Sequence, residues 1–232
     1  MICRRSRHFK LHTPHSKLHT INVKKEGVFL HIKTIPVGQL ETNCYIVTDE
    51  ATLKCAVIDP GDESNTILNY LEDNHLRCEA IMLTHGHFDH TGAVMSVAEE
   101  TGATVYMNSR DDSRVQSSDQ LEFSLPENGI NYDDGDIINV GGLSFEVLAT
   151  PGHTEGGVTL KCEDCLFTGD TLFRGSLGRT DLVGGDSVKI MGSLKKLCSL
   201  EGDYEVYPGH LDSTTLQRER SFNYYCRTAM GM

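Results

Sequence analysis

The sequence Thr84-His85-Gly86-His87-Phe88-Asp89-His90 contains a dense group of candidate metal donors. It places three histidines and one aspartate within six residues. Imidazole nitrogens and carboxylate oxygens suit zinc, and also non-haem iron or manganese. Four donors this close cannot readily surround one ion, because neighbouring side chains point in different directions. The spacing favours two adjacent ions, with His85 and His87 turned toward one and Asp89 and His90 toward the other.

Three later donors each follow a predicted strand and stand beside a glycine, which lets the backbone turn sharply and approach an ion. Together with the first cluster they make a set of candidate ligands large enough for two ions that share a carboxylate and a water molecule. Each ion would keep a position for a substrate. The predicted metal ligands are His85, His87, Asp89, His90, His153, Asp170 and His210.

Composition and charge exclude several classes of protein. The chain has 232 residues, enough to bury a substantial core, and no apolar run approaches the roughly 20 residues of a membrane span. Its formal net charge is −12. Residues 1–27 hold seven of the 21 Lys and Arg but one acidic residue, so the remainder is strongly acidic. Such a surface repels nucleic-acid phosphates, and no dedicated protein partner is indicated beyond a monomer or homodimer.

The eight cysteines are scattered, and a chain of this length does not need disulfides for stability. No apolar stretch follows the basic N-terminus, so no export signal is predicted. The expected location is therefore the cytoplasm, with reduced thiols. Cys162-Glu-Asp-Cys165 could form a redox pair or half of a zinc site. It lacks a second pair at the proper spacing, which favours two cysteines at a hairpin turn.

The order of predicted elements indicates one α/β (α+β) domain built as two similar halves over residues 28–232. Residues 1–27 are interpreted as a basic, disordered extension or, alternatively, a mitochondrial-type transit peptide. The polar segment 109–134 is predicted to be a surface excursion that could act as a lid. Strands are expected at 28–35, 43–48, 54–58, 80–83, 104–107, 136–140, 143–149, 158–161, 166–168 and 205–207, and helices at 62–74, 92–101, 187–200 and 214–228.

Four motifs carry a resemblance to the metallo-β-lactamase superfamily. They are His85-Gly-His-Phe-Asp-His90, Pro151-Gly-His-Thr154, Gly169-Asp-Thr-Leu-Phe173 and Pro208-Gly-His210. The runs Gly169–Asp181 and Pro36–Tyr45 are similar to glyoxalase II-like hydrolases within it. The resemblance covers about residues 30–220. It implies a four-layer αββα sandwich with the site at one edge.

The resemblance also implies how the ligands divide. His85, His87 and His153 would bind the first metal, Asp89, His90 and His210 the second, and Asp170 would bridge the two. The cofactors would be two divalent ions, with zinc expected and iron or manganese as alternatives. Asp59 matches a family aspartate that orients a ligand histidine or a metal-bound water, and Thr84 is expected to support the ligands beside it. Asp59 could equally be a turn-former in Asp59-Pro60-Gly61.

The implied function is a thioesterase of the hydroxyacylglutathione hydrolase type that uses a metal-bridging hydroxide, with Asp89 and Asp170 as the catalytic carboxylates that hold it. A thioester suits the site, because a thiolate leaves without prior protonation. Arg179 and Arg174 are candidates for substrate binding. Only 22 residues follow His210. The chain therefore resembles a short form without the full C-terminal glutathione-binding region, and glutathione specificity is left open.

Other activities fit the same motifs. A mononuclear iron persulfide dioxygenase would hold one iron through His85, His153 and Asp170. A lactonase or another ester hydrolase, including a β-lactamase, is a further alternative on this fold. A binding module without catalysis is disfavoured, because all seven donors are present.

Overall fold

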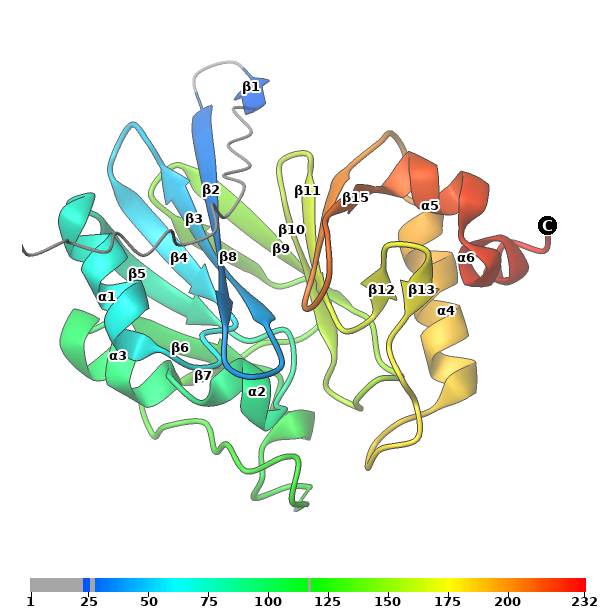
Figure 1. Cartoon of the computed structure of the whole chain (residues 1–232), viewed down its shortest axis with the longest axis horizontal. Helices are drawn as coiled ribbons and strands as arrows, with labels where there is room; N and C mark the ends of the chain where they lie inside the picture. The colour runs from blue at the N-terminus through cyan, green and yellow to red at the C-terminus, as the bar shows by residue number, and fades with distance from the viewer. Residues whose placement is uncertain (1–22, 26–27, 117) are drawn as a thin grey trace, which may run out of the picture.

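The computed structural model describes residues 23–25, 28–116 and 118–232. Two β-sheets pack face to face, and helices cover both outer faces (Figure 1). Helices α1 (Ser64–Asp73) and α3 (Val94–Thr101) lie over the first sheet. Helices α4 (Ser187–Cys198), α5 (Leu216–Phe222) and α6 (Tyr224–Ala229) lie over the second. The arrangement is the expected four-layer αββα sandwich.

Within the described residues, the first sheet has seven strands in sequence order. Strands β1 to β4 pair antiparallel, whereas β4 to β7 pair parallel. The connection from β4 to β5 passes through α1 and that from β5 to β6 through α3, because a parallel strand needs a crossover to return to the same edge. The segment between β6 and β7 contains a 3₁₀ turn instead of an α-helix. The strands are β1 (Val23–Lys25), β2 (Val28–Val37), β3 (Thr42–Asp49), β4 (Lys54–Ile58), β5 (Arg77–Met82), β6 (Thr104–Met107) and β7 (Ile130–Asn131).

The second sheet has six strands, in the order β15-β14-β11-β10-β9-β8. Its pairs are antiparallel except for β11 and β14, which are connected through α4. A separate small hairpin pairs β12 with β13. The bounds are β8 (Ile137–Val140), β9 (Leu143–Ala149), β10 (Val158–Cys162), β11 (Cys165–Gly169), β12 (Leu172–Phe173), β13 (Ser176–Leu177), β14 (Glu205–Pro208) and β15 (Thr214–Thr215).

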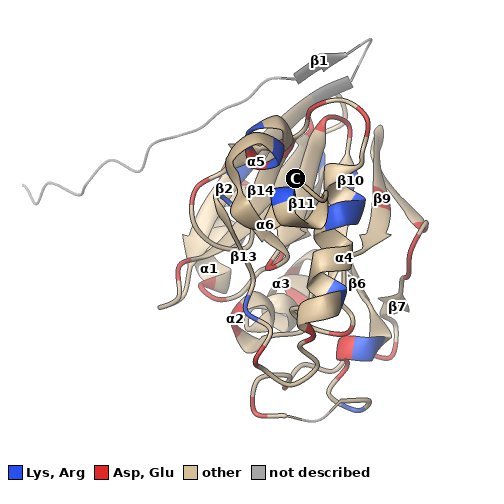
Figure 2. Cartoon of the chain, turned by 90° about the vertical axis from the view of Figure 1, so that its right-hand side faces the viewer, with Lys and Arg blue, Asp and Glu red and all other residues tan. Residues whose placement is uncertain are grey.

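Strand β3 shows why the layers form, because its side chains alternate between two buried faces. Tyr45 and Val47 point to the core between the sheets, whereas Cys44 and Ile46 point to the core beneath α1 and α3. A strand buried on both faces carries apolar residues at nearly every position, as this one does. A third core lies between the second sheet and the helices α4, α5 and α6. Figure 2 shows these three helices in front of β11 and β14.

Two regions differ from the sequence expectation. The helix predicted over 214–228 is divided at Asn223, whose extended backbone ends α5 and whose side chain accepts hydrogen bonds from the first backbone N–H groups of α6. The segment 109–134 is more than a surface excursion, because Leu121 and Tyr132 are buried. It contains the 3₁₀ turn η1 (Ser109–Asp111) and strand β7. Its role as a lid stays a prediction.

The predicted N-terminal extension falls largely outside the described residues, at 1–22 and 26–27. Val23–Lys25 forms β1, which pairs antiparallel with the start of β2. The division between an extension and a domain at residue 28 stays a prediction. Among the helices of the described residues, none is both long and apolar enough to cross a membrane.

Candidate metal centre

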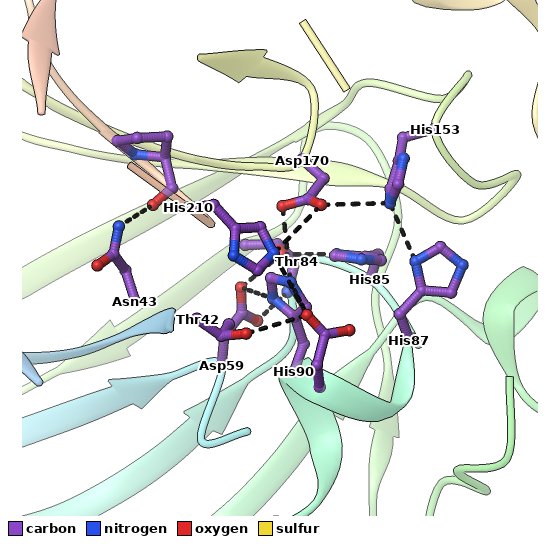
Figure 3. A network of polar contacts seen from close by, with 12 residues as sticks. Thr42, Asn43, Asp59, Thr84, His85, His87, His90, His153, Asp170 and His210 are labelled. Atoms are coloured by element: carbon purple, nitrogen blue, oxygen red, sulfur yellow. Dashed lines mark hydrogen bonds and ion pairs between the residues drawn. The ribbon is translucent and has the colours of Figure 1, made fainter. Parts of the chain in front are cut away.

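All seven predicted ligands lie together at one end of the sandwich, where strands of both sheets end (Figure 3). The loop after β5 carries His85 and His87, and the short helix α2 (Phe88–Thr91) carries Asp89 and His90. The remaining donors, His153, Asp170 and His210, each follow a strand of the second sheet: β9, β11 and β14. Strand ends from two sheets therefore bring together residues that are up to 125 positions apart.

The donors form two groups of three. Donor atoms of His85, His87 and His153 lie within 4.8 Å of one another. In this group His87 Nδ1 is 3.0 Å from His153 Nε2. Asp89, His90 and His210 form the second group under the same distance limit. The division is the one implied by the resemblance.

Asp170 lies between the two groups. Its Oδ2 is 3.5 Å from His153 Nε2 in the first group and 3.6 Å from His210 Nε2 in the second. Its Oδ1 is 3.6 Å from His90 Nε2. A Cβ atom at Gly209 would lie 2.2 Å from Asp170 Oδ1, so only glycine leaves room for this carboxylate. A carboxylate between the two groups of donors could be shared by two ions.

Four donor atoms of this cluster are buried without a hydrogen-bond partner among the described residues. They are His85 Nε2, His87 Nε2, His90 Nε2 and Asp170 Oδ1. Buried polar atoms are normally hydrogen-bonded, because an unsatisfied one costs about 1–3 kcal/mol. Imidazole and carboxylate donors gathered in this way fit metal ions of the zinc, iron or manganese type. The His and Asp clusters are thus suited to a dinuclear metal site.

Two histidines of the first group, His85 and His87, are held in the protonation state that binds a metal. Burial, followed by the neighbouring imidazoles, lowers the pKa of His85 well below its ordinary value. Burial and then His153 lower the pKa of His87 to about 3. Both rings are therefore neutral near pH 7, and neutral imidazole is the form that offers a lone pair to a cation.

The second group is electrostatically different, because carboxylates surround it. Burial alone would lower the pKa of His90, but Asp59, followed by Asp170 and Asp89, raises it to about 9. Burial would raise the pKa of Asp89, yet its hydrogen bond with His210 and the charge of His90 bring it below its ordinary value. This half of the site therefore favours positive charge.

Both carboxylate oxygens of Asp59 accept hydrogen bonds from residues of the donor cluster or beside it. Its Oδ1 accepts the backbone N–H of Thr84 at 2.7 Å, and its Oδ2 accepts the Thr84 hydroxyl at 2.6 Å and His90 Nδ1 at 2.9 Å. Although Asp59 lies within reach of His85 and His90, these bonds occupy both oxygens. Because Nδ1 donates to Asp59, the Nε2 atom of His90 faces the other donors. The contacts place Asp59 and Thr84 beside the donors, and their role in orienting ligands stays a prediction.

Backbone carbonyls hold two further predicted ligands, His153 and His210, in a similar way. His153 Nδ1 is 2.8 Å from the carbonyl oxygen of Arg179, and His210 Nδ1 is 3.1 Å from that of Leu40. Since a carbonyl only accepts, each ring donates through Nδ1 and turns Nε2 toward the centre of the site.

The two predicted substrate-binding arginines have exposed side chains that pair with aspartates. Arg179 donates to both carboxylate oxygens of Asp181, at 2.7 Å each. Arg174 donates to Asp212 at 3.1 Å. Arg179 contacts the site through its backbone, and substrate contact by either guanidinium stays a prediction.

Arg179→Ala is expected to raise KM for an anionic substrate by less than about tenfold and to leave kcat and metal content unchanged, because an exposed ion pair contributes little. The substitution keeps the carbonyl that holds His153. Steady-state kinetics and metal analysis test this. Arg110→Ala is the matched control, since Arg110 forms a similar exposed pair with Asp133. Loss of a metal ion in Arg179→Ala would contradict the expectation.

Two contacts of the site were not anticipated from sequence. The buried carboxylate of Asp111 accepts hydrogen bonds from Gly86 N at 3.1 Å, Thr154 Oγ1 at 2.6 Å and Gly156 N at 2.6 Å. It therefore joins the loop of His85 and His87 to the loop of His153. Thr42 donates to Asp89 Oδ2 at 3.0 Å. Asp111 lies in the segment interpreted as a surface excursion, and no motif distinguishes it.

Cys162 and Cys165 are opposite each other at the β10–β11 turn, as the hairpin interpretation expects. Both are buried in the core between the sheets and form no disulfide. Burial, followed by the charge of Glu205, raises the pKa of Cys165 to about 12. The thiol form is thus favoured over the thiolate that redox or zinc chemistry requires.

Fold and donors together define an αββα protein with a site suited to two metal ions. A family model described as the metallo-beta-lactamase superfamily matches residues 37–210. The chain belongs to the metallo-β-lactamase superfamily, whose members are mostly hydrolases.

Individual relatives differ in their described activities. Hydroxyacylglutathione hydrolase GloC of Haemophilus influenzae is 32% identical over 207 residues, covering 84% of this chain and 97% of that protein. The BLEG-1 B3 metallo-beta-lactamase is 31% identical, with a TM-score of 0.74 and coverage of 84% and 99%. TTHA1623, solved in a di-iron-bound form, is 35% identical, with a TM-score of 0.71 and coverage of 83% and 99%.

Proposed function

We propose that the chain is a dinuclear metal-dependent thioesterase of the hydroxyacylglutathione hydrolase type. The observation that carries the proposal is Asp170, whose two oxygens face one histidine of the first group and two of the second. A carboxylate in this position suits two ions held side by side. The similarity to GloC supports the substrate class.

The residues divide into holding and orienting roles. His85, His87 and His153 would hold one ion, Asp89, His90 and His210 the other, and Asp170 both. When bound, two divalent cations supply a hydroxide nucleophile near neutral pH and polarise the thioester carbonyl. Asp59 and the carbonyls of Arg179 and Leu40 keep the imidazole rings directed at the centre of the site.

A thioester fits the groups that the site offers. Hydrolysis of an ordinary ester or amide benefits from an acid that protonates the leaving group. A thiolate leaves without one, and Asp89 is no such acid, because its pKa lies below the ordinary value for a carboxyl. Zinc is the expected metal, with iron or manganese as alternatives. The related protein TTHA1623, which was solved in a di-iron-bound form, supports iron as one of these alternatives.

The working environment follows from the thiols. The seven cysteines in the described residues are free and buried. We propose a cytoplasmic enzyme, monomeric or homodimeric, that acts on a small thioester. Whether the carrier thiol is glutathione depends on contacts at Arg179 and Arg174.

Metal analysis run alongside a thioester assay tests the proposal. We expect the purified full chain to carry close to two metal equivalents and to hydrolyse S-lactoylglutathione or a simpler thioester. Removal of metal by a chelator is expected to abolish the activity, and divalent metal to restore it. A single iron with oxygen consumption and no hydrolysis would instead indicate the persulfide dioxygenase alternative. Hydrolysis of β-lactams or lactones, without thioester hydrolysis, would refute the substrate class.

A further inference from the structure

Residues 40–43, at the end of the β2–β3 turn and the start of β3, contact the second group of donors, although none of them is a predicted ligand. The hydroxyl of Thr42 donates to Asp89 Oδ2 at 3.0 Å, and the carbonyl oxygen of Leu40 is 3.1 Å from His210 Nδ1. Thr42 is fully buried. Two of the three donors in the second group are therefore oriented by residues only two positions apart in the chain.

Asn43 fixes the loop that carries His210 (Figure 3). Its side-chain amide donates to the carbonyls of Pro208 at 3.0 Å and Leu211 at 2.9 Å, on either side of the histidine. Its backbone N–H donates to the carbonyl of Gly209 at 2.7 Å. The side chain of Asn43 is buried, so water is not a ready substitute for these bonds.

The first group is oriented by other parts of the chain. His85 Nδ1 contacts the hydroxyl of Thr84 at 3.1 Å, and His153 contacts the carbonyl of Arg179. In the part of the chain that the structure describes, no hydrogen bond joins residues 40–43 to His85, His87 or His153. Asp59 connects both groups, through Thr84 beside His85 and through His90, whereas the hydrogen bonds from residues 40–43 reach the second group alone.

We propose that Thr42 and Asn43 are positioning residues for the second metal ion, and that they set its affinity independently of the first. The proposal rests on the dinuclear site of the proposed function. The Thr42 hydroxyl keeps one rotamer of the Asp89 carboxylate, and Asn43 keeps the His210 loop at a fixed distance from β3. Loss of such an outer hydrogen bond typically weakens metal binding by about 10–100-fold.

Thr42→Val tests the first half of the proposal, because valine keeps the shape of threonine and removes the hydroxyl. The metal-stripped full chain is titrated with Zn²⁺ against a chelating dye, which resolves the first and second binding events. We expect Kd for the second ion to rise about 10–100-fold and Kd for the first to stay unchanged. Thr42→Ser, which restores the hydroxyl, is expected to recover most of the affinity.

Thr48→Val is the matched control. Thr48 is also buried on β3, and its hydroxyl has no partner among the described residues. We expect this variant to bind both ions as the unchanged chain does. If Thr42→Val binds the second ion with an unchanged Kd, or if Kd rises equally for both ions, the proposed positioning role of Thr42 is wrong.

Asn43→Ala tests the other half by the same titration, with circular dichroism to confirm folding. We expect the same selective loss of the second ion, again by about 10–100-fold. If a folded Asn43→Ala binds both ions as tightly as the unchanged chain does, or loses the same affinity for both ions, Asn43 has no positioning role for the second ion. An unchanged chain that binds one ion would overturn the dinuclear function as well. Two ions without thioester hydrolysis would refute only the substrate assignment.

Discussion

His87→Ala is expected to lower kcat/KM for thioester hydrolysis by about 10²–10³-fold or more, while the protein stays folded. His87 belongs to the first group of donors, and its Nδ1 is 3.0 Å from His153 Nε2. The variant leaves two histidines and Asp170 for the first ion. Because His87 is in a loop at the edge of the sandwich and outside the three apolar cores, its loss removes little packing.

The measurement combines kinetics, metal analysis and circular dichroism. We expect the metal content to fall from about two equivalents toward one, because the first ion loses one of its three histidines and the remaining carboxylate, Asp170, lies between both groups of donors. His31→Ala is the control, since His31 is a partly buried histidine of β2 outside the site. Full activity and full metal content in His87→Ala would mean that the first group is not a metal site.

The convergence of the candidate donors could be predicted from sequence because their pattern is local. Four lie within six residues, and His153, Asp170 and His210 each follow a strand and stand next to a glycine. Strand ends tend to meet at one edge, so the residues that follow them can be expected to converge. The layers could be predicted for the same reason: the apolar alternation of β3 and the helical stripes that face it are short-range signals.

The contacts that orient the ligands are long-range and lack such a signal. Thr42 and Asp89 are 47 residues apart, and Asp111 and Thr154 are 43 apart. A single threonine or aspartate in a polar segment is typical of a solvated loop, so composition predicted a solvent-exposed Asp111 without a role in the site. Asn223 shows the same limit in the fold. The helical pattern continues through 214–228, and only the side-chain contacts of Asn223 reveal the break.

Asp111→Ala is expected to lower the free energy of unfolding by about 3 kcal/mol or more, because each buried donor left without an acceptor costs about 1–3 kcal/mol. Three donors lose their partner: Gly86 N, Thr154 Oγ1 and Gly156 N. In a chain of this length, the corresponding fall in Tm is about 6–12 °C. Measurement on the metal-stripped protein separates this effect from the stabilisation that bound metal provides.

The same substitution tests how the first group is assembled. Gly86 separates His85 from His87, and Thr154 follows His153, so the Asp111 carboxylate is a direct connection between their two loops. We expect Asp111→Ala to lower the affinity for the first ion more than the affinity for the second. The expected effect of Thr42→Val is the opposite. Asp133→Ala is the control, because Asp133 is a partly exposed aspartate of the same segment. A folded Asp111→Ala with unchanged Tm and unchanged affinity for the first ion would show that these loops keep their positions without this carboxylate.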